Sequence, residues 1–154
     1  LQAVIEASGF FPASKKFHLQ IFCGPYCNHD LYEELLARSS ENISVDSFSD
    51  IFPEWLEAAD LSISMGGYNS CMNVLKAGVP ALIYPFKQNR EQAMRGLALE
   101  KTGNIRLITE QDLSPKVLID KITSMLGSDR TPTSINLDGA SQTLNQLNHW
   151  RNNR

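Results

Sequence analysis

The chain has 154 residues, of which 42% are hydrophobic and 20% are charged. This composition is typical of a globular protein large enough to bury a core, and no apolar run approaches the roughly 18 residues that a membrane span needs. The formal net charge of −3 at pH 7 argues against the basic surface of a nucleic-acid-binding protein, so we expect no nucleic-acid partner.

The chain begins with Leu1, and residues 1–8 already have a helical pattern. We therefore expect the sequence to be the C-terminal part of a longer protein.

Short β-like runs then alternate with longer helical patterns. Strands are expected at 17–22, 43–45, 61–65, 81–84 and 105–109. Helices are expected at 31–38, 53–58, 69–77, 89–102 and 115–126. This alternation predicts an α/β fold, with a Rossmann-like parallel sheet flanked by helices. Ligands of such sheets bind at the carboxyl ends of the strands.

Local signals support these boundaries. Gly78 and Pro80 end the helix at 69–77, and Gly103 ends the next one. The polar stretch 127–137 predicts a linker. After it, the stripe of Ala140, Leu144, Leu147 and Trp150 predicts a final helix at about 138–150. We expect one domain at 1–127, and a linker with a C-terminal helix at 128–154.

The three cysteines Cys23, Cys27 and Cys71 are an odd number, and their spacing has no repeated CxxC pair. The pattern therefore predicts free thiols and no zinc site. Free thiols are typical of a reducing compartment, so we expect a cytoplasmic protein.

A glycine-rich turn, Gly66-Gly67-Tyr68-Asn69-Ser70, lies between a predicted strand and a predicted helix. The unpaired N–H groups of a helix start favour an anion, and glycine lets a ligand approach the backbone closely. Asn69 and Ser70 can cap the helix or bind a phosphate. The GxGxxG and GxxxxGK[ST] patterns are absent, which argues against a dinucleotide oxidoreductase and a nucleoside triphosphatase. A plain structural turn remains an alternative.

The sequence around this turn resembles the donor-nucleotide half of GT-B glycosyltransferases, and within them the MurG-like family 28. The segments that carry the resemblance are "AADLSISMGGYNSCMNVLKAGVPALIYPF", "NREQAMRGLALEKTG" and "LITEQDLS". It extends from about residue 17 to residue 126 and implies the C-terminal half of a GT-B fold. In that family the glycine-rich turn holds the donor diphosphate, which maps to Gly66, Gly67, Tyr68, Asn69 and Ser70.

The resemblance implies further donor contacts on the helices that follow. Asn73 stands where related enzymes have a carboxylate that binds the ribose hydroxyls, a departure from the pattern. Glu91 and Gln92 correspond to the pair that contacts the donor sugar. Arg90 is a candidate phosphate contact, because the stretch from 87 to 106 has five basic residues and two acidic ones. Alternatively, Asn73, Glu91 and Gln92 are ordinary residues on solvent-exposed helix faces.

Two loops nearer the N-terminus complete the implied site. Phe48 and Ser49 correspond to the stretch that frames the base, and Gly24 lies in a loop that faces the ligand. Core packing is the alternative for Phe48, and also for Tyr68.

The resemblance implies that the full-length protein transfers a sugar from a nucleotide-diphosphate sugar, by default a UDP-sugar, to an acceptor hydroxyl. No metal or other cofactor is implied. An N-terminal acceptor domain and the first strand of the donor domain would lie outside this chain, so the chain alone would have no turnover. Peripheral membrane association would come through that acceptor domain. A nucleotide-sugar hydrolase or epimerase, and a non-catalytic partner module of a split glycosyltransferase, remain alternatives.

Overall fold

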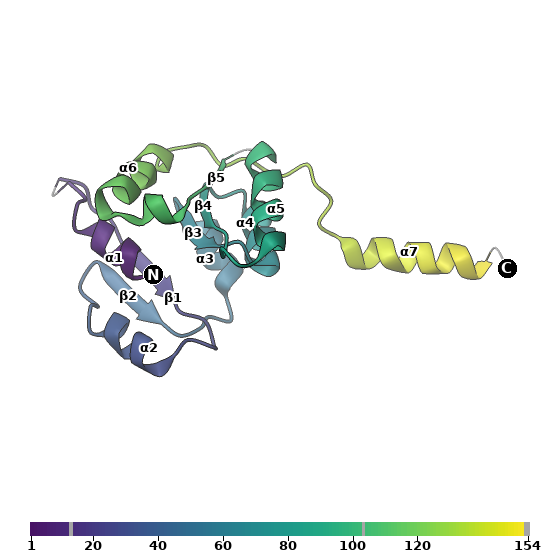
Figure 1. Ribbon diagram of the computed structural model, residues 1–154. Helices are drawn as coiled ribbons and strands as arrows, with labels where there is room; N and C mark the ends of the chain where they lie inside the picture. Colours follow the sequence, from purple (N-terminus) through teal and green to yellow (C-terminus); the bar gives the residue numbers. More distant parts are fainter. Residues whose placement is uncertain (13, 103, 153–154) are drawn as a thin grey trace.

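In the computed structural model, which describes residues 1–12, 14–102 and 104–152, five parallel strands form two separate ladders (Figure 1). The strands are β1 (Leu19–Phe22), β2 (Ile43–Asp46), β3 (Ser62–Met65), β4 (Ala81–Tyr84) and β5 (Ile105–Leu107). β1 pairs with β2, and β4 pairs with β3 on one side and β5 on the other. The predicted parallel α/β architecture is confirmed, but the strands do not form one continuous sheet.

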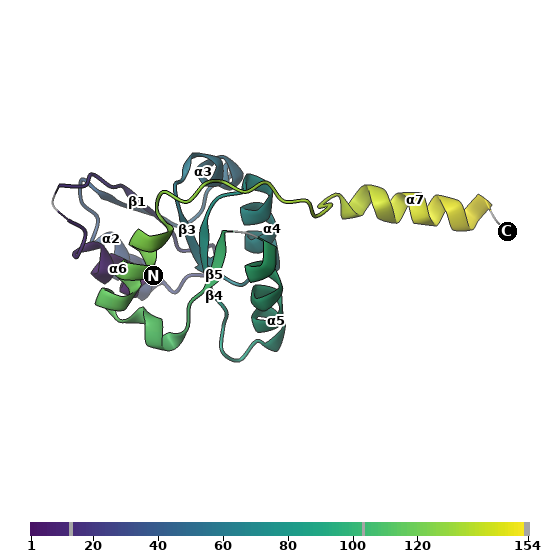
Figure 2. The same ribbon diagram turned by 90° about the horizontal axis from the view of Figure 1, so that it is seen from above.

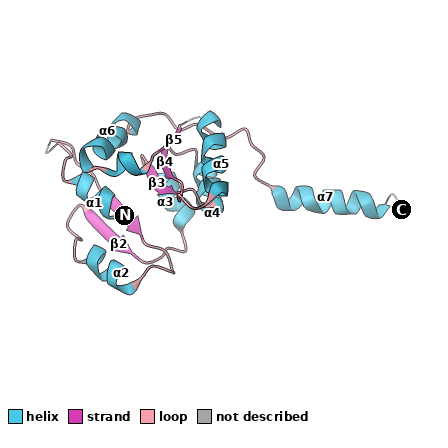
Figure 3. Cartoon of the chain, viewed as in Figure 1, coloured by secondary structure: helices cyan, strands magenta, loops and turns pink. Residues whose placement is uncertain are grey.

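Helices connect the strands, as parallel crossovers require. They are α1 (Gln2–Ser8), α2 (His29–Leu36), α3 (Phe52–Ala58), α4 (Tyr68–Ala77), α5 (Arg90–Leu99), α6 (Pro115–Met125) and α7 (Gly139–Asn152), with short 3-10 turns η1 (Glu100–Thr102) and η2 (Glu110–Leu113). Figure 3 shows this alternation of helices and strands. The predicted elements are all present. α2 starts earlier than expected because the Asn28 side chain caps it by accepting a hydrogen bond from the Asp30 N–H.

Two layers of helices cover the β3–β4–β5 ladder, with α1 and α6 on one face and α4 and α5 on the other (Figures 1 and 2). α6 buries Leu118, Ile119, Ile122 and Met125, whose spacing places them on one helix face. α4 buries Cys71, Val74 and Leu75 on the opposite face of the ladder. Burying each of these larger apolar side chains contributes about 1.5–3 kcal/mol, so the two layers together fix the strand positions.

The two ladders end at β1 and β3, which are edge strands in the described part of the chain. α1 contacts both ladders, since Ile5 packs in the core beside β1 and β2 whereas Ala7 packs in the core beneath β4. Ser64 of β3 has a buried hydroxyl that lacks a hydrogen-bond partner among the described residues. β2 and β5 are the other edges of the two ladders, so each of these four strands pairs with a strand on one side only in the described part of the chain. That a first strand is missing from this domain stays a prediction.

The segment after α6 has no regular secondary structure, as predicted, but it is held against the body. The Arg130 guanidinium donates to the carbonyl oxygens of Glu57 at 2.7 Å, Ala59 at 2.5 Å and Ala77 at 3.1 Å, and more weakly to Leu56. These carbonyls lie at the carboxyl ends of α3 and α4, where a cation is favoured by the helix dipoles.

Gly78, which follows α4, has a φ of +65° in the left-handed region, and its carbonyl accepts from the Thr131 N–H at 3.0 Å. The predicted helix stop is confirmed here; the one predicted at Gly103 lies outside the described residues. The division of the chain at residue 127 stays a prediction.

α7 lies apart from the body in both ribbon views (Figures 1 and 2). The apolar side chains Leu144, Leu147 and Trp150 of the predicted stripe are exposed. Among the described residues no helix is both long enough and apolar enough to span a bilayer.

Replacing Arg130 with alanine is expected to lower the free energy of unfolding by on the order of 1–3 kcal/mol, because several carbonyls at two helix ends lose a charged donor. Thermal unfolding followed by circular dichroism measures the effect. The control is Arg38→Ala, which removes only an exposed ion pair with Glu34 at 3.5 Å and should cost less than about 1 kcal/mol. Equal effects of the two variants would contradict the proposed role of Arg130.

Candidate functional site

The glycine-rich turn leads from β3 directly into α4. The Gly66 N–H donates to the Tyr84 carbonyl oxygen at 3.3 Å and so continues the pairing with β4. Gly67 is the N-cap of α4, and no side chain caps the helix there. The first intrahelical bond is made by the Cys71 N–H to the Gly67 carbonyl at 3.0 Å. The three preceding amides thus belong to an open helix start, where backbone donors and the helix dipole favour an anion.

Asn69 and Ser70 lie in the first turn of α4, so the alternative that one of them caps the helix is wrong. A side-chain cap would have occupied one of the N–H groups that a ligand could use.

The lack of a side chain has a different physical consequence at each of the two glycines. Gly66 is buried, and a Cβ there would lie 3.2 Å from the Gln92 Cβ and 3.4 Å from the Gln92 carbonyl oxygen. A Cβ at Gly67 would have only the Ser70 hydroxyl nearby, at 3.9 Å. Gly66 therefore permits close packing against α5, whereas Gly67 leaves room above the helix start.

The start of α5 lies against this turn, so the structure brings residues 66–70 together with residues 90–92. Asn89 caps α5 by accepting from the Gln92 N–H at 3.1 Å. The Gln92 side-chain oxygen accepts from the Phe86 N–H at 2.9 Å, which leaves its NH2 group as the donor toward a ligand. The side chain of Glu91 is 80% exposed, and Arg90 is exposed as well.

Arg95 is a residue of this site that the sequence did not single out. Its guanidinium donates to the Gly66 carbonyl at 2.7 Å, forms an ion pair with Glu91 and lies 5.4 Å from the centre of the Tyr68 ring. The Arg95 side chain is only 15% exposed. The spacing of Glu91 and Arg95 predicts the ion pair, but the contacts with the turn join segments that are distant in sequence. Arg95 thus fixes the turn and the helix α5 relative to each other.

Two predicted residues on α4 are accessible to a ligand. Tyr68 is 63% exposed, so the alternative that it is a core residue is wrong. Asn73 is half-buried and follows Asn69 by one helical turn, so both amides lie on one face of α4.

The remaining predicted residues form a second group beside the other ladder. The Gly24 N–H donates to the Ser47 carbonyl at 2.8 Å, which joins the loop after β1 to the loop after β2. Phe48 is 60% exposed, so core packing is excluded for this residue as well. The Ser49 hydroxyl oxygen accepts from the Ile51 N–H at 3.3 Å, which forms a short turn just before α3. All the predicted residues follow the carboxyl ends of β1 to β4, as expected for a ligand site of a parallel fold.

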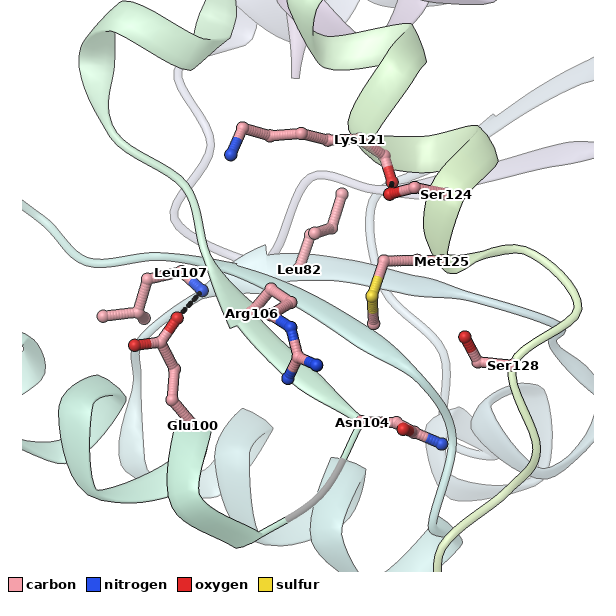
Figure 4. A pocket seen from close by; sticks show the side chains of 9 residues that line it. All are labelled: Leu82, Glu100, Asn104, Arg106, Leu107, Lys121, Ser124, Met125 and Ser128. Carbon is pink, nitrogen blue, oxygen red and sulfur yellow. Dashed lines mark hydrogen bonds between the residues drawn. The ribbon is translucent and has the colours of Figure 1, made fainter.

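A cavity of about 400 Å³ lies elsewhere, between β5, α6 and the segment after α6 (Figure 4). Arg106, Lys121, Ser124, Met125 and Ser128 are among its lining residues, and none of the predicted donor residues is. Asn104, just before β5, also lines it, which places the cavity at the amino end of that strand. Ligands of parallel sheets bind at the opposite edge.

The described residues contain no group of three or more His, Cys, Asp or Glu side chains arranged to hold a metal ion. The polar groups at the glycine-rich turn are backbone amides, the Arg95 guanidinium and the polar side chains of α4 and α5.

A family model described as the glycosyltransferase family 28 C-terminal domain matches residues 1–145. The chain belongs to this family. The resemblance found in the sequence is thereby confirmed.

Curated relatives of this family 28 domain are UDP-N-acetylglucosamine–N-acetylmuramyl-(pentapeptide) pyrophosphoryl-undecaprenol N-acetylglucosamine transferases. The one from Clostridium kluyveri is 30% identical over 108 residues, which are 68% of this chain and 31% of that protein. The one from Proteus mirabilis is 29% identical over 94 residues, 59% of this chain and 26% of that protein. The chain thus spans about a third or less of the length of these relatives.

Two solved structures share the fold. The glycotransferase of kitacinnamycin superposes with a TM-score of 0.65 at 20% identity, covering 82% of this chain and 30% of that one. MurG of Acinetobacter baumannii superposes with a TM-score of 0.59 at 18% identity, covering 81% of this chain and 44% of that one. These likenesses confirm the predicted Rossmann-like half of a GT-B fold.

Gly66→Ala is expected to destabilise the family 28 domain by about 1–3 kcal/mol, because the new methyl group meets the backbone and Cβ of Gln92. Gly67→Ala is the matched control and should cost about 0.5 kcal/mol, the effect of a poorer N-cap. Both changes reduce the freedom of the unfolded chain equally, so that contribution cancels in the comparison. Urea denaturation of the two variants checks the difference, and equal midpoints would contradict the close packing of the turn on α5.

Proposed function

We propose that this chain is the donor-binding domain of a glycosyltransferase and that it binds a nucleotide-diphosphate sugar. The observation that carries the proposal is the open start of α4, where no side chain caps the helix and Arg95 holds the Gly66 carbonyl at 2.7 Å. A UDP-sugar is the first candidate, because the names of the curated relatives contain UDP-N-acetylglucosamine.

In this proposal the diphosphate lies at the start of α4 and accepts hydrogen bonds from the backbone amides of Tyr68, Asn69 and Ser70. When the sugar leaves, negative charge develops on the diphosphate, and N–H groups already fixed by the helix stabilise that charge without rearranging. Arg90, which is exposed at the start of α5, adds a positive charge on the same side.

The other predicted residues bind the rest of the donor. The exposed carboxylate of Glu91 and the NH2 group of Gln92 suit the hydroxyl groups of a sugar. Asn73 is placed to bind the ribose hydroxyls. The backbone around Phe48 and Ser49 frames the base, and Gly24 gives the ligand room beside β1.

The acceptor hydroxyl and its catalytic base are proposed to come from an acceptor domain outside this chain, so the chain alone binds the donor without turnover. We propose a cytoplasmic location, which the three free cysteines support, and membrane contact only through the acceptor domain. The donor is a substrate, and no resident cofactor is proposed.

The decisive experiment compares UDP-, GDP- and TDP-sugars by thermal shift with the whole 154-residue chain. A ligand at 100 times its Kd stabilises the folded state by about 2.7 kcal/mol, and UDP-N-acetylglucosamine is expected to give the largest shift. Gly67→Val should abolish this shift, because its side chain fills the space above the helix start.

The shift is measured against each variant without ligand, so a change in basal stability does not affect the comparison. Gly139→Val is the matched control, since no atom lies within 4 Å of a Cβ at that position. Its shift should equal that of the unmodified chain. An undiminished shift in Gly67→Val would place the site elsewhere, and no shift with any nucleotide-sugar would refute donor binding.

Asn73 stands where related enzymes have a carboxylate, and this difference offers a test of where the ribose binds. Asn73→Asp is expected to tighten UDP-sugar binding by about 1 kcal/mol, or about fivefold in Kd, because a carboxylate accepts stronger hydrogen bonds from a diol. Asn69→Asp adds the same charge beside the diphosphate and should weaken binding through repulsion. Isothermal titration calorimetry measures both, and a change of the same sign in both variants would contradict the assignment of Asn73.

A further inference from the structure

Cys23 and Cys27 lie at the two ends of a tight turn that follows β1. The Cys27 N–H donates to the Gly24 carbonyl at 3.1 Å, which closes the turn Gly24-Pro25-Tyr26-Cys27. Gly24 has a φ of +85°, a conformation that glycine adopts without strain. The turn brings the two cysteines close together, so that the Cys27 thiol contributes to raising the pKa of the Cys23 thiol.

Both cysteines are held from outside the turn. The Cys23 N–H donates to the Asp46 carbonyl at 3.0 Å, which anchors the first cysteine to the end of β2. Cys27 directly precedes Asn28, the N-cap of α2, whose side chain accepts from the Asp30 N–H at 2.8 Å. The backbone on both sides of the turn is therefore anchored to fixed elements, and little backbone entropy is lost when the two cysteines are joined.

The turn is also open to reagents. Both cysteines are free and partly exposed, and Tyr26 at the tip of the turn is 99% exposed. The third cysteine, Cys71, is fully buried on α4. Within the same chain it therefore serves as a thiol that a reagent cannot reach while the protein is folded.

We propose that Cys23 and Cys27 form a dithiol modification site that reacts with low-molecular-weight disulfides and closes to an intramolecular disulfide. The Cys27 thiolate attacks one sulfur of the reagent R–S–S–R, forms a mixed disulfide and releases one thiolate R–S⁻. Cys23 then loses its proton to solvent and attacks the Cys27 sulfur, which releases the second R–S⁻. Two protein thiols are oxidised, the reagent disulfide is reduced, and the two R–S⁻ take up the two protons.

The environments of the two thiols set this order. Burial and the neighbouring Cys27 raise the pKa of the Cys23 thiol above its ordinary value, so Cys23 keeps its proton. Cys23 also packs against the core around Ile21, Leu35 and Val45, which hinders a bulky reagent. Cys27 therefore reacts first, and Cys23 resolves the mixed disulfide.

The test is a reaction of the whole chain with glutathione disulfide at neutral pH, stopped with acid and analysed by intact and peptide mass spectrometry. The unmodified chain is expected to lose two hydrogens through a Cys23–Cys27 bond, with no stable glutathione adduct. Cys23→Ser should instead keep one glutathionyl group on Cys27. Cys27→Ser should react more slowly, since only the packed Cys23 remains.

Two controls keep the result interpretable. Cys71→Ala should leave the reaction unchanged, and Cys71 should stay unmodified in every variant. A serine variant in which Cys71 reacts is unfolded. In that case Cys27→Ala and Cys23→Ala replace the serine variants in the same measurement. A stable adduct on Cys27 in the unmodified chain, or no reaction of either thiol, would overturn the proposal. The readout does not depend on nucleotide-sugar binding, so this inference and the proposed function fail separately.

Discussion

The burial of β4 on all sides is the constraint on which the body of this protein depends. Ala81, Leu82 and Ile83 pair with strands on both edges and are covered by helices on both faces. Parallel neighbours can be reached only through crossovers, so each strand has to be followed by a chain segment that returns over one face. The consequence is that the loops after β3 and β4 meet at one edge, and this is where the glycine-rich turn and the start of α5 are found.

At that edge the turn is held from its protein side and left open on the other. Arg95 binds the Gly66 carbonyl, Gln92 binds the Phe86 amide, and the absence of a side chain at Gly66 lets α5 approach. None of these contacts uses the amides at the start of α4. A site of this kind is preorganised, because the backbone donors are fixed before a ligand arrives.

Most of the fold could be predicted from the sequence, because strand and helix patterns alternate and glycine and proline mark the boundaries. The separation of β1 and β2 from the other strands could not, since periodicity identifies strands but carries no information on which of them pair. The candidate site was predicted as residues after strand ends, and the structure brings the turn at 66–70 to residues 90–92. Arg95 was missed because its significance lies in contacts with Gly66 and Tyr68. Both of these residues precede β4, whereas Arg95 follows it, so the contacts join distant parts of the sequence. Arg130 was missed for the same reason, since nothing local indicates that a residue in a polar linker binds the ends of two helices.

The position of Arg130 has a mechanical consequence. α4 is attached to the glycine-rich turn at its amino end, and at its carboxyl end Ala77 and Gly78 are bonded to Arg130 and Thr131. α4 therefore joins the candidate site at one end to the segment that leads to α7 at the other. Arg130 and Thr131 fix the point where that segment leaves the body, so the reach of α7 is set from the carboxyl end of α4 and not from the end of α6.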